Sequence, residues 1–277
     1  MASFPPACLL KQEYQEEDRR GKMAGVGQNW SDLVHLGSMQ VIGHRGAAAL
    51  APENTWASFD TALALGVDAI ETDVRATSDG QLILLHDERL SRTTNGDGFV
   101  RETPWSVIQL LDAGAWFSQD FQGARVPLLS ETLERYGQQL PLIIEIKQLD
   151  LELRVLDMVR HYGLLDTVSF TSFYFPVVQN MKLLAPEAKV GYLTSDTGDE
   201  SVQRVIEAGL DQFCPPAQAV SAPQVRAWKA LGLDIRAWGV RDPELMQAAL
   251  EAGVDGMTVD FPHLLLQAVG RMERQKD

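Results

Sequence analysis

From residue 39 onward, the chain alternates short apolar runs with longer amphipathic segments. The apolar runs that predict strands occupy 40–43, 69–74, 81–86, 142–146, 167–170, 189–193, 212–214, 234–238 and 256–259. The segments that predict helices occupy 55–65, 130–136, 151–162, 201–208, 222–230 and 243–252. Nearly continuous apolar strands that alternate with helices are typical of a parallel sheet covered by helices. The alternation therefore predicts an α/β fold.

The sequence contains nine apolar runs, one more than the eight strands of a closed α/β barrel. Only residues 75–80, which include Ser78-Asp79-Gly80, separate the run at 81–86 from the preceding one. A parallel crossover needs ~10 or more residues, and this short segment carries a hairpin signal instead. We expect the run to fold back antiparallel and to return His86 toward Asp73. The remaining runs predict a (β/α)8 TIM barrel with a small insertion, about 87–127, on its C-terminal face.

The length of 277 residues suits a single barrel, which takes roughly 250 residues. We expect the barrel domain to span 39–265, between an N-terminal extension at 1–38, expected to be disordered, and a C-terminal tail at 266–277. The start of the chain lacks the features of a signal peptide, and no run reaches the ~18–20 apolar residues of a membrane span. Two distant cysteines, Cys8 and Cys214, predict no disulfide framework and favour the cytoplasm.

The charge balance restricts the partners of the chain. It carries 24 Lys and Arg residues against 38 Asp and Glu residues, which gives a net charge of −14. An acidic surface repels the phosphates of nucleic acids and of anionic membranes. We therefore expect no nucleic-acid partner and no stable membrane association. A phosphate that this protein binds has to belong to a small molecule and has to be held by a local cluster of cations.

Carboxylates gather on two of the predicted strands. Glu71 and Asp73 are two residues apart, so their side chains leave the same face of a strand. Glu145 and Lys147 repeat this spacing. Carboxylates that face one another inside a barrel repel unless a cation lies between them, and an all-oxygen ligand set favours one divalent cation, Mg²⁺ or Ca²⁺. The alternative is a strand-end ion pair between Glu145 and Lys147, with Glu71 and Asp73 as helix caps.

Two histidines and two cations accompany these carboxylates. His44 and His86 stand at predicted strand ends, and an imidazole titrates close enough to neutral pH to act as a base or an acid. Arg45 and Lys147 are placed to contact a phosphate, and the glycines of Gly43–Gly46 let the backbone approach a ligand closely. A lone histidine at such a place is more often structural, but two histidines beside a carboxylate cluster favour catalysis.

The same residues belong to a longer series of motifs: His44-Arg45-Gly46, Pro52-Glu53-Asn54-Thr55, Glu71-Thr72-Asp73-Val74, Asp79-Gly80, His86-Asp87, Arg92-Thr93-Thr94, Pro127-Leu128-Leu129, Glu145-Ile146-Lys147, Ser172-Phe173, Trp238 and the stretch from Gly253 to Pro262. In this order, from about residue 41 to about residue 262, the chain resembles the glycerophosphodiester phosphodiesterases. The resemblance implies metal-dependent hydrolysis of a small glycerophosphodiester to sn-glycerol 3-phosphate and an alcohol, on a barrel with a small insertion. The nucleophile is either water or the glycerol 2-hydroxyl.

The resemblance also assigns roles to residues. It implies that Glu71, Asp73 and Glu145 are the metal ligands. His44 and His86 match the acid–base pair of the family, and Arg45 and Lys147 match its phosphate contacts. Trp238 is expected to form an apolar wall for the glycerol carbons. The chain departs from the family pattern just beyond it, where Gly239 stands in place of the usual threonine and Arg241, two residues further on, in place of the usual asparagine.

Two other functions are compatible with these residues. One is a phospholipase-like lyase on a related barrel that acts on intact lipid; the acidic charge and the lack of an anchor weigh against it. The other is a non-catalytic module that binds a metal ion and a phosphodiester. Binding alone does not require an acid–base pair, so His44 and His86 favour the hydrolase.

Overall fold

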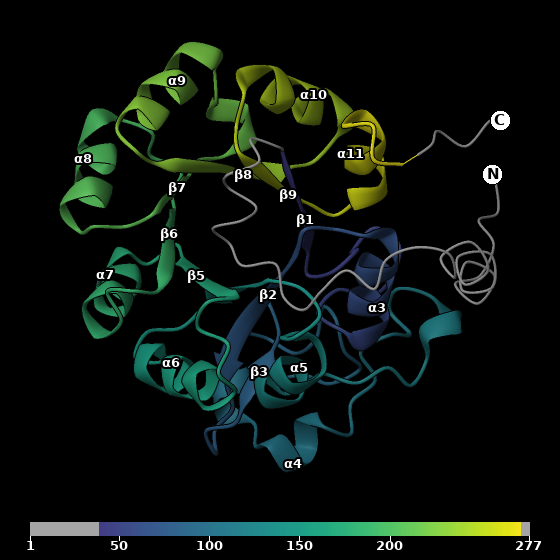
Figure 1. The fold of residues 1–277 in the computed structure, drawn as a ribbon. Helices are drawn as coiled ribbons and strands as arrows, with labels where there is room; N and C mark the ends of the chain where they lie inside the picture. The colour runs from purple at the N-terminus through teal and green to yellow at the C-terminus, as the bar shows by residue number, and fades with distance from the viewer. Residues whose placement is uncertain (1–38, 273–277) are drawn as a thin grey trace, which may run out of the picture.

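The computed structural model, which describes residues 39–272, is a closed parallel barrel surrounded by helices (Figure 1). Its strands are β1 (Gln40–His44), β2 (Ala69–Ala76), β4 (Leu142–Ile146), β5 (Val168–Ser172), β6 (Lys189–Leu193), β7 (Gln212–Cys214), β8 (Asp234–Val240) and β9 (Gly256–Val259). Each strand pairs in parallel with its neighbour, and β1 closes the barrel because it pairs with both β2 and β9. The predicted (β/α)8 TIM barrel is confirmed.

The helices lie outside the strands and cover them (Figure 1). They are α3 (Trp56–Leu65), α5 (Leu129–Tyr136), α6 (Glu152–His161), α7 (Phe175–Leu184), α8 (Asp199–Glu207), α9 (Ala222–Ala230), α10 (Pro243–Ala252) and α11 (Pro262–Ala268). The pattern of the sequence did not indicate α7 or α11. In α7, Val177 and Met181 are buried whereas Leu183 and Leu184 are exposed, so its apolar residues do not mark one face.

Strand β3 (Leu82–Leu84) is the predicted antiparallel strand. Leu84 pairs with Val74 of β2, and the amide of Leu85 donates to the carbonyl of Asp73 at 3.0 Å. Because β2 extends past the neighbouring strands before the chain turns back, this pairing returns His86 to the level of Asp73. The short antiparallel strand thus delivers a histidine to the carboxyl ends of the barrel strands.

Residues 87–127, which we call the insertion, lie between β3 and α5. They contain two 3₁₀ turns, η1 (Val100–Glu102) and η2 (Gln119–Phe121), and the short helix α4 (Trp105–Ile108), which lies outside the ring of helices in Figure 1. Leu90, Val100, Ile108 and Val126 pack with Ile83 of β3 into a small core of their own. This second core gives the insertion a fixed attachment to the hairpin that carries His86.

Successive side chains of β2 point alternately to the two sides of the sheet, which are two different environments. Ile70 and Val74 belong to the main core between the strands and the helices. Glu71 and Asp73 therefore project to the opposite side, into the barrel. Inside the barrel, Ile42, Ala69 and Ile143 form a small apolar cluster. The apolar contacts of the main core stabilise the barrel while the carboxyl ends of its strands remain available for polar side chains.

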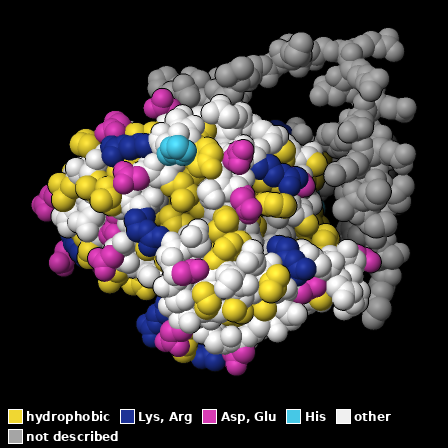
Figure 2. Space-filling view, turned by 90° about the horizontal axis from the view of Figure 1, so that it is seen from below, with side chains coloured by type: hydrophobic (Ala, Val, Ile, Leu, Met, Phe, Trp, Pro, Cys, Tyr) yellow, Lys and Arg dark blue, Asp and Glu magenta, His cyan; other side chains and the backbone are white. Residues whose placement is uncertain are grey.

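The described residues extend beyond the predicted end of the barrel domain. Helix α11 continues to Ala268, and the Arg271 guanidinium donates to Asp68 at 2.6 Å and to the carbonyl of Gly66 at 3.0 Å. The predicted N-terminal extension at 1–38 lies outside the described residues. Between 39 and 272, no helix is long and apolar enough to cross a membrane. On the face shown in Figure 2, side chains of both charge signs are interspersed.

Candidate active site

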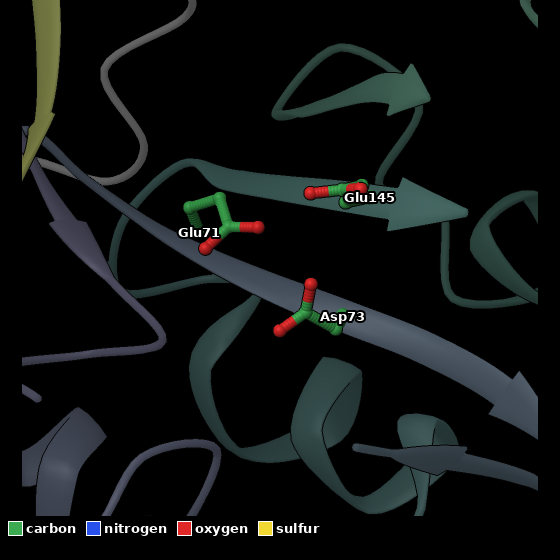
Figure 3. Close-up of side chains that lie close together, drawn as sticks. All are labelled: Glu71, Asp73 and Glu145. Carbon is green, nitrogen blue, oxygen red and sulfur yellow. The ribbon is translucent and has the colours of Figure 1, made fainter. Parts of the chain in front are cut away.

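The acidic cluster lies where β1, β2 and β4 run side by side. The register pairs His44 with Glu71 and Asp73 with Glu145. Figure 3 shows Glu71 and Asp73 on β2 and Glu145 on β4, with their carboxylates turned toward one another. One oxygen from each of the three lies within 4.8 Å of the other two. The residues are only 2%, 0% and 6% exposed, respectively, so water does not screen their charges.

The turn after β1 places Arg45 beside this cluster. Arg45 adopts a φ of 51° and Gly46 a φ of 93°, both in the left-handed region. A Cβ at Gly46 would collide with the backbone and side chain of Ser58 on α3, so only glycine fits this close approach. The Ser58 hydroxyl donates to the carbonyl of Arg45 at 2.8 Å. The turn is therefore held against α3 with the Arg45 side chain directed to the carboxylates.

Two cations lie against the three carboxylates. Arg45 Nε is 3.1 Å from Asp73 Oδ2, and Lys147 Nζ is 2.7 Å from Glu145 Oε1 and 3.6 Å from Asp73 Oδ1. The backbone amide of Arg45 also donates to Glu71 Oε2 at 3.1 Å. The predicted strand-end ion pair of Glu145 and Lys147 is thus present, as one part of the cluster. Three carboxylates face two cations, which leaves one negative charge without a counter-ion.

This surplus of negative charge changes the proton affinity of the cluster. Burial and the nearby charge of Asp73 raise the pKa of Glu71 to about 7, and the same two causes raise the pKa of Glu145. Burial also acts to raise the pKa of Asp73, but Arg45 and Lys147 outweigh it and the pKa lies below its ordinary value. A proton or another cation is required to balance the charge.

Two carboxylate oxygens of the cluster that accept no hydrogen bond from the described residues could ligate a divalent cation. Glu71 Oε1 and Asp73 Oδ1 are buried, and neither has a hydrogen-bond partner in the described part of the chain. Asn54 occupies the other oxygen of Asp73, donating from Nδ2 at 2.8 Å. Carboxylate oxygens that converge in this way form the ligand set that Mg²⁺ and Ca²⁺ prefer. The three predicted ligands therefore meet in one group that could hold a divalent ion.

The two histidines flank the cluster, and each is held by an aspartate. His44 Nδ1 lies 2.6 Å from Asp260 Oδ1, and His86 Nδ1 lies 2.7 Å from Asp87 Oδ1. An ionised carboxylate only accepts hydrogen bonds, so Nδ1 is the donor in both pairs and Nε2 is left for other partners. His44 Nε2 is 3.9 Å from Glu71 Oε2. In both imidazoles, the nitrogen that could exchange a proton with a ligand is Nε2.

The surroundings shift the pKa values of the two histidines in opposite directions. Burial acts to lower the pKa of His44, but the hydrogen bond to Asp260 and the negative charges of Glu71 and Asp260 together outweigh it, and the pKa is raised. Burial lowers the pKa of His86 and Arg45 adds to the effect, so the pKa falls despite the nearby Asp73. Two imidazoles with separated proton affinities are suited to acid–base chemistry.

A second aromatic residue, Phe173, lies between Trp238 and the cationic side of the site. Its indole Nε1 donates to the carbonyl of Cys214 at 3.0 Å, which fixes the ring at the end of β8. The ring of Phe173 packs edge-to-face against it at 4.9 Å, and Lys147 Nζ lies 5.6 Å from the Phe173 centroid. Arg241 donates to Gln218 at 2.9 Å on the surface. The aromatic pair therefore adjoins the cationic side of the cluster.

The structure brings together the seven residues predicted at the strand ends: His44, Arg45, Glu71, Asp73, His86, Glu145 and Lys147. The sequence reasoning assigned no role to Asp260, Asn54 or Phe173, although each lies in one of the motifs quoted above. Their positions in the motifs were visible, but their partners are far away in the chain. Asp260 and His44, for example, are 216 residues apart.

A parallel barrel with buried carboxylates, two tethered histidines and two cations at the carboxyl ends of its strands is suited to hydrolysis of a phosphate ester. The model of the glycerophosphoryl diester phosphodiesterase family matches residues 44–264. The chain belongs to this family.

Relatives of known sequence and structure agree with this membership. A glycerophosphodiester phosphodiesterase of Caldanaerobacter subterraneus is 35% identical over 235 residues, which cover 83% of this chain and 97% of that protein. The structure of a glycerophosphodiester phosphodiesterase from Agrobacterium tumefaciens has a TM-score of 0.76 and 34% identity, and covers 83% of this chain and 100% of its own. An Oleispira antarctica phosphodiesterase in complex with the product sn-glycerol-3-phosphate has a TM-score of 0.77 and 30% identity, over 86% of this chain and 99% of its own.

The raised pKa of Glu71 predicts how the stability of the metal-free protein depends on pH. The ordinary pKa of 4.5 applies to the unfolded chain and the value of about 7 to the folded one, so folding favours the protonated form. This contribution is present below about pH 4.5 and is lost as the pH rises toward 7. Glu71→Gln cannot titrate, so the fall in Tm of chelated protein over this range should be smaller in the variant.

Addition of Mg²⁺ or Ca²⁺ above pH 7 should raise the Tm of the wild type more than that of Glu71→Gln, because the cation replaces the proton. Thermal unfolding followed by circular dichroism measures both effects. An identical pH dependence in the two proteins, with no response to either cation, would contradict this account of the cluster.

Proposed function

We propose that this protein hydrolyses glycerophosphodiesters to sn-glycerol 3-phosphate and an alcohol, with one divalent cation, Mg²⁺ or Ca²⁺, held by Glu71, Asp73 and Glu145. The observation that carries the proposal is the buried acidic cluster, in which two described carboxylate oxygens accept no hydrogen bond, beside two aspartate-tethered histidines. Family membership and the related phosphodiesterase that binds sn-glycerol-3-phosphate support the substrate class.

The cations of the chain are proposed to hold the phosphate. A divalent ion, when bound, would withdraw electron density from the phosphoryl group and offset its negative charge. Arg45 can donate to phosphate oxygens through its planar guanidinium, and Lys147 can contribute a point charge from β4. Both side chains are already fixed by carboxylates, so their positions are set before the substrate binds. Such preorganised charge stabilises the additional charge of the transition state.

The histidines are proposed to transfer protons at Nε2. One accepts the proton of the attacking hydroxyl as its oxygen bonds to phosphorus, and the other donates a proton to the leaving alkoxide as the second phosphorus–oxygen bond breaks. Asp260 and Asp87 bind the Nδ1 side of the rings and so keep each Nε2 directed away from its aspartate.

The substrate is a small molecule, and the two cysteines support a reducing compartment, the cytoplasm, as the place of action.

The direct test is release of glycerol 3-phosphate from glycerophosphocholine, followed by a coupled assay. The protein should release it with Mg²⁺ or Ca²⁺ present and lose this activity after chelation. Release of a cyclic phosphate as the final product would favour a lyase instead. Saturable binding of the diester without turnover in the presence of either cation would point to a binding module.

Loss of either histidine should lower turnover strongly. His44→Ala and His86→Ala are each expected to reduce kcat by ~10²–10⁴-fold, the range that general acid–base catalysis supplies. Affinity for a non-cleavable phosphodiester should change far less, because Arg45 and Lys147 remain. Steady-state kinetics and calorimetry measure the two effects.

His161→Ala is the matched control, because His161 ends α6 and its ring packs against Tyr162. Its turnover should equal that of the wild type. Near-normal turnover of His44→Ala or His86→Ala across about pH 6–9 would leave that histidine with a structural role only.

The alcohol group of the substrate should be discriminated weakly. Arg45 and Lys147 are proposed to hold the phosphate, and Arg241 is bonded to Gln218, so few charged groups remain to bind the alcohol. We expect choline, ethanolamine and glycerol esters to be cleaved within about tenfold of one another, or ~1.4 kcal/mol of discrimination. Measurement of kcat/KM over this panel, with serine and inositol phosphate esters added, tests the expectation. A strong preference for an anionic ester that disappears in Arg241→Asn would overturn it.

A further inference from the structure

Arg92 of the insertion joins two carboxylates at the edge of the site. Its Nε and Nη2 atoms donate to Asp87 Oδ2 at 2.6 Å and to Asp87 Oδ1 at 2.9 Å. Its Nη1 and Nη2 atoms donate to Glu53 Oε2 at 2.8 Å and to Glu53 Oε1 at 2.7 Å. One guanidinium therefore forms a forked pair of hydrogen bonds with each of two carboxylates.

Each of these carboxylates also holds a residue of the proposed catalytic machinery. Asp87 Oδ1, which accepts from Arg92, also lies 2.7 Å from His86 Nδ1. Glu53 Oε1, which accepts from the same Arg92 Nη2, also accepts from Arg45 Nη1 at 2.7 Å. A single nitrogen atom of Arg92 thus lies between the oxygen that holds the histidine and the oxygen that holds the phosphate-binding arginine.

We propose that Arg92 is a positioning residue that fixes His86 and Arg45 relative to each other through Asp87 and Glu53. This inference rests on the proposed function. The insertion supplies the residue, and its separate apolar core anchors the segment to the β3 hairpin. Asp87 and Glu53 belong to different segments of the chain, and Arg92 is the described side chain that bonds to both.

The geometry of the guanidinium is essential to this role. Arginine presents its N–H groups in a rigid planar fork that matches two carboxylates, whereas lysine provides one flexible ammonium group. Without the guanidinium, Asp87 Oδ1 and Glu53 Oε1 would face each other as like charges and would separate. His86 and Arg45 would then lose the position of one hydrogen-bond partner each. The Arg92 side chain is 42% exposed, whereas the side chains of Asp87 and Glu53 are 29% and 10% exposed, so Arg92 acts from the rim on partners that are less exposed than itself.

Kinetics of Arg92→Gln and Arg92→Lys test the proposal. Loss of an outer partner of an active-site group typically lowers activity roughly 10- to 100-fold. We therefore expect kcat to fall by about this factor because His86 is no longer held in position. We expect KM to rise because Arg45 is no longer held in position. Lysine should not restore the wild-type values. Arg89→Gln is the matched control, because Arg89 lies in the same insertion, is 50% exposed and pairs with Asp97 at 3.1 Å. Its kcat and KM should remain within about twofold of wild type.

A double-mutant cycle separates positioning from simple anchoring of the insertion. If Arg92 acts on turnover through Asp87, then Arg92→Gln should lower kcat by much less in the Asp87→Asn background than in the wild type. If Arg92 only anchors the insertion, the loss of kcat should be equal in both backgrounds and should follow a loss of Tm. That second result would overturn the proposal.

Nitrogen NMR of the histidine rings provides a readout that does not depend on turnover. In the wild type, the His86 signals, assigned with His86→Ala, should report one tautomer with the proton on Nδ1. In Arg92→Gln the signals should shift or broaden as the ring loses its fixed partner, whereas Arg89→Gln should match the wild type. A wild type that hydrolyses no diester would refute the proposed function, yet this spectrum would still test Arg92. Unchanged His86 signals in Arg92→Gln would refute its role.

Discussion

Three buried carboxylates and only two adjacent cations define the centre of this protein. Glu71, Asp73 and Glu145 are removed from water, and this burial together with the nearby charge of Asp73 raises the pKa of Glu71 to about 7. In a protein interior such repulsion destabilises the fold unless a counter-charge is supplied. The barrel tolerates the cluster because Arg45, Lys147 and Asn54 are fixed around it. The remaining negative charge is the charge that a bound cation would balance.

The rest of the molecule can be understood as support for this cluster. The apolar layer between strands and helices holds β1, β2 and β4 in register, so that carboxylates from two strands meet without relying on flexible loops. The turn after β1 brings Arg45 to the cluster, and β3 returns His86 to it. Asp260 and Asp87 bind the Nδ1 atoms of the two imidazoles. The insertion adds Arg92, which joins the surroundings of His86 to those of Arg45.

Much of this arrangement could be predicted from the sequence because it depends on local spacing. The two-residue spacing of Glu71 and Asp73 determines their shared face, and the short turn before β3 indicates its antiparallel direction. Helix α7 was missed because its apolar residues do not follow one face. The bonds of Asp260 to His44 and of Arg92 to Glu53 were also missed. They join residues 216 and 39 positions apart. The pairing of β9 with β1, which closes the barrel, brings Asp260 to His44, and the pairing of β2 with both β1 and β3 brings the insertion to the segment that carries Glu53.

The proposed function requires that the acidic cluster binds one divalent cation on which hydrolysis depends. The most direct measurement is a titration of metal-free protein with Mg²⁺ or Ca²⁺, in which bound cation and released glycerol 3-phosphate are determined in the same samples. The account predicts that both rise together and reach their limit at about one equivalent per chain, and that Asp73→Asn, folded but lacking one ligand, shows neither rise. Full release of glycerol 3-phosphate by exhaustively chelated wild-type protein would contradict it.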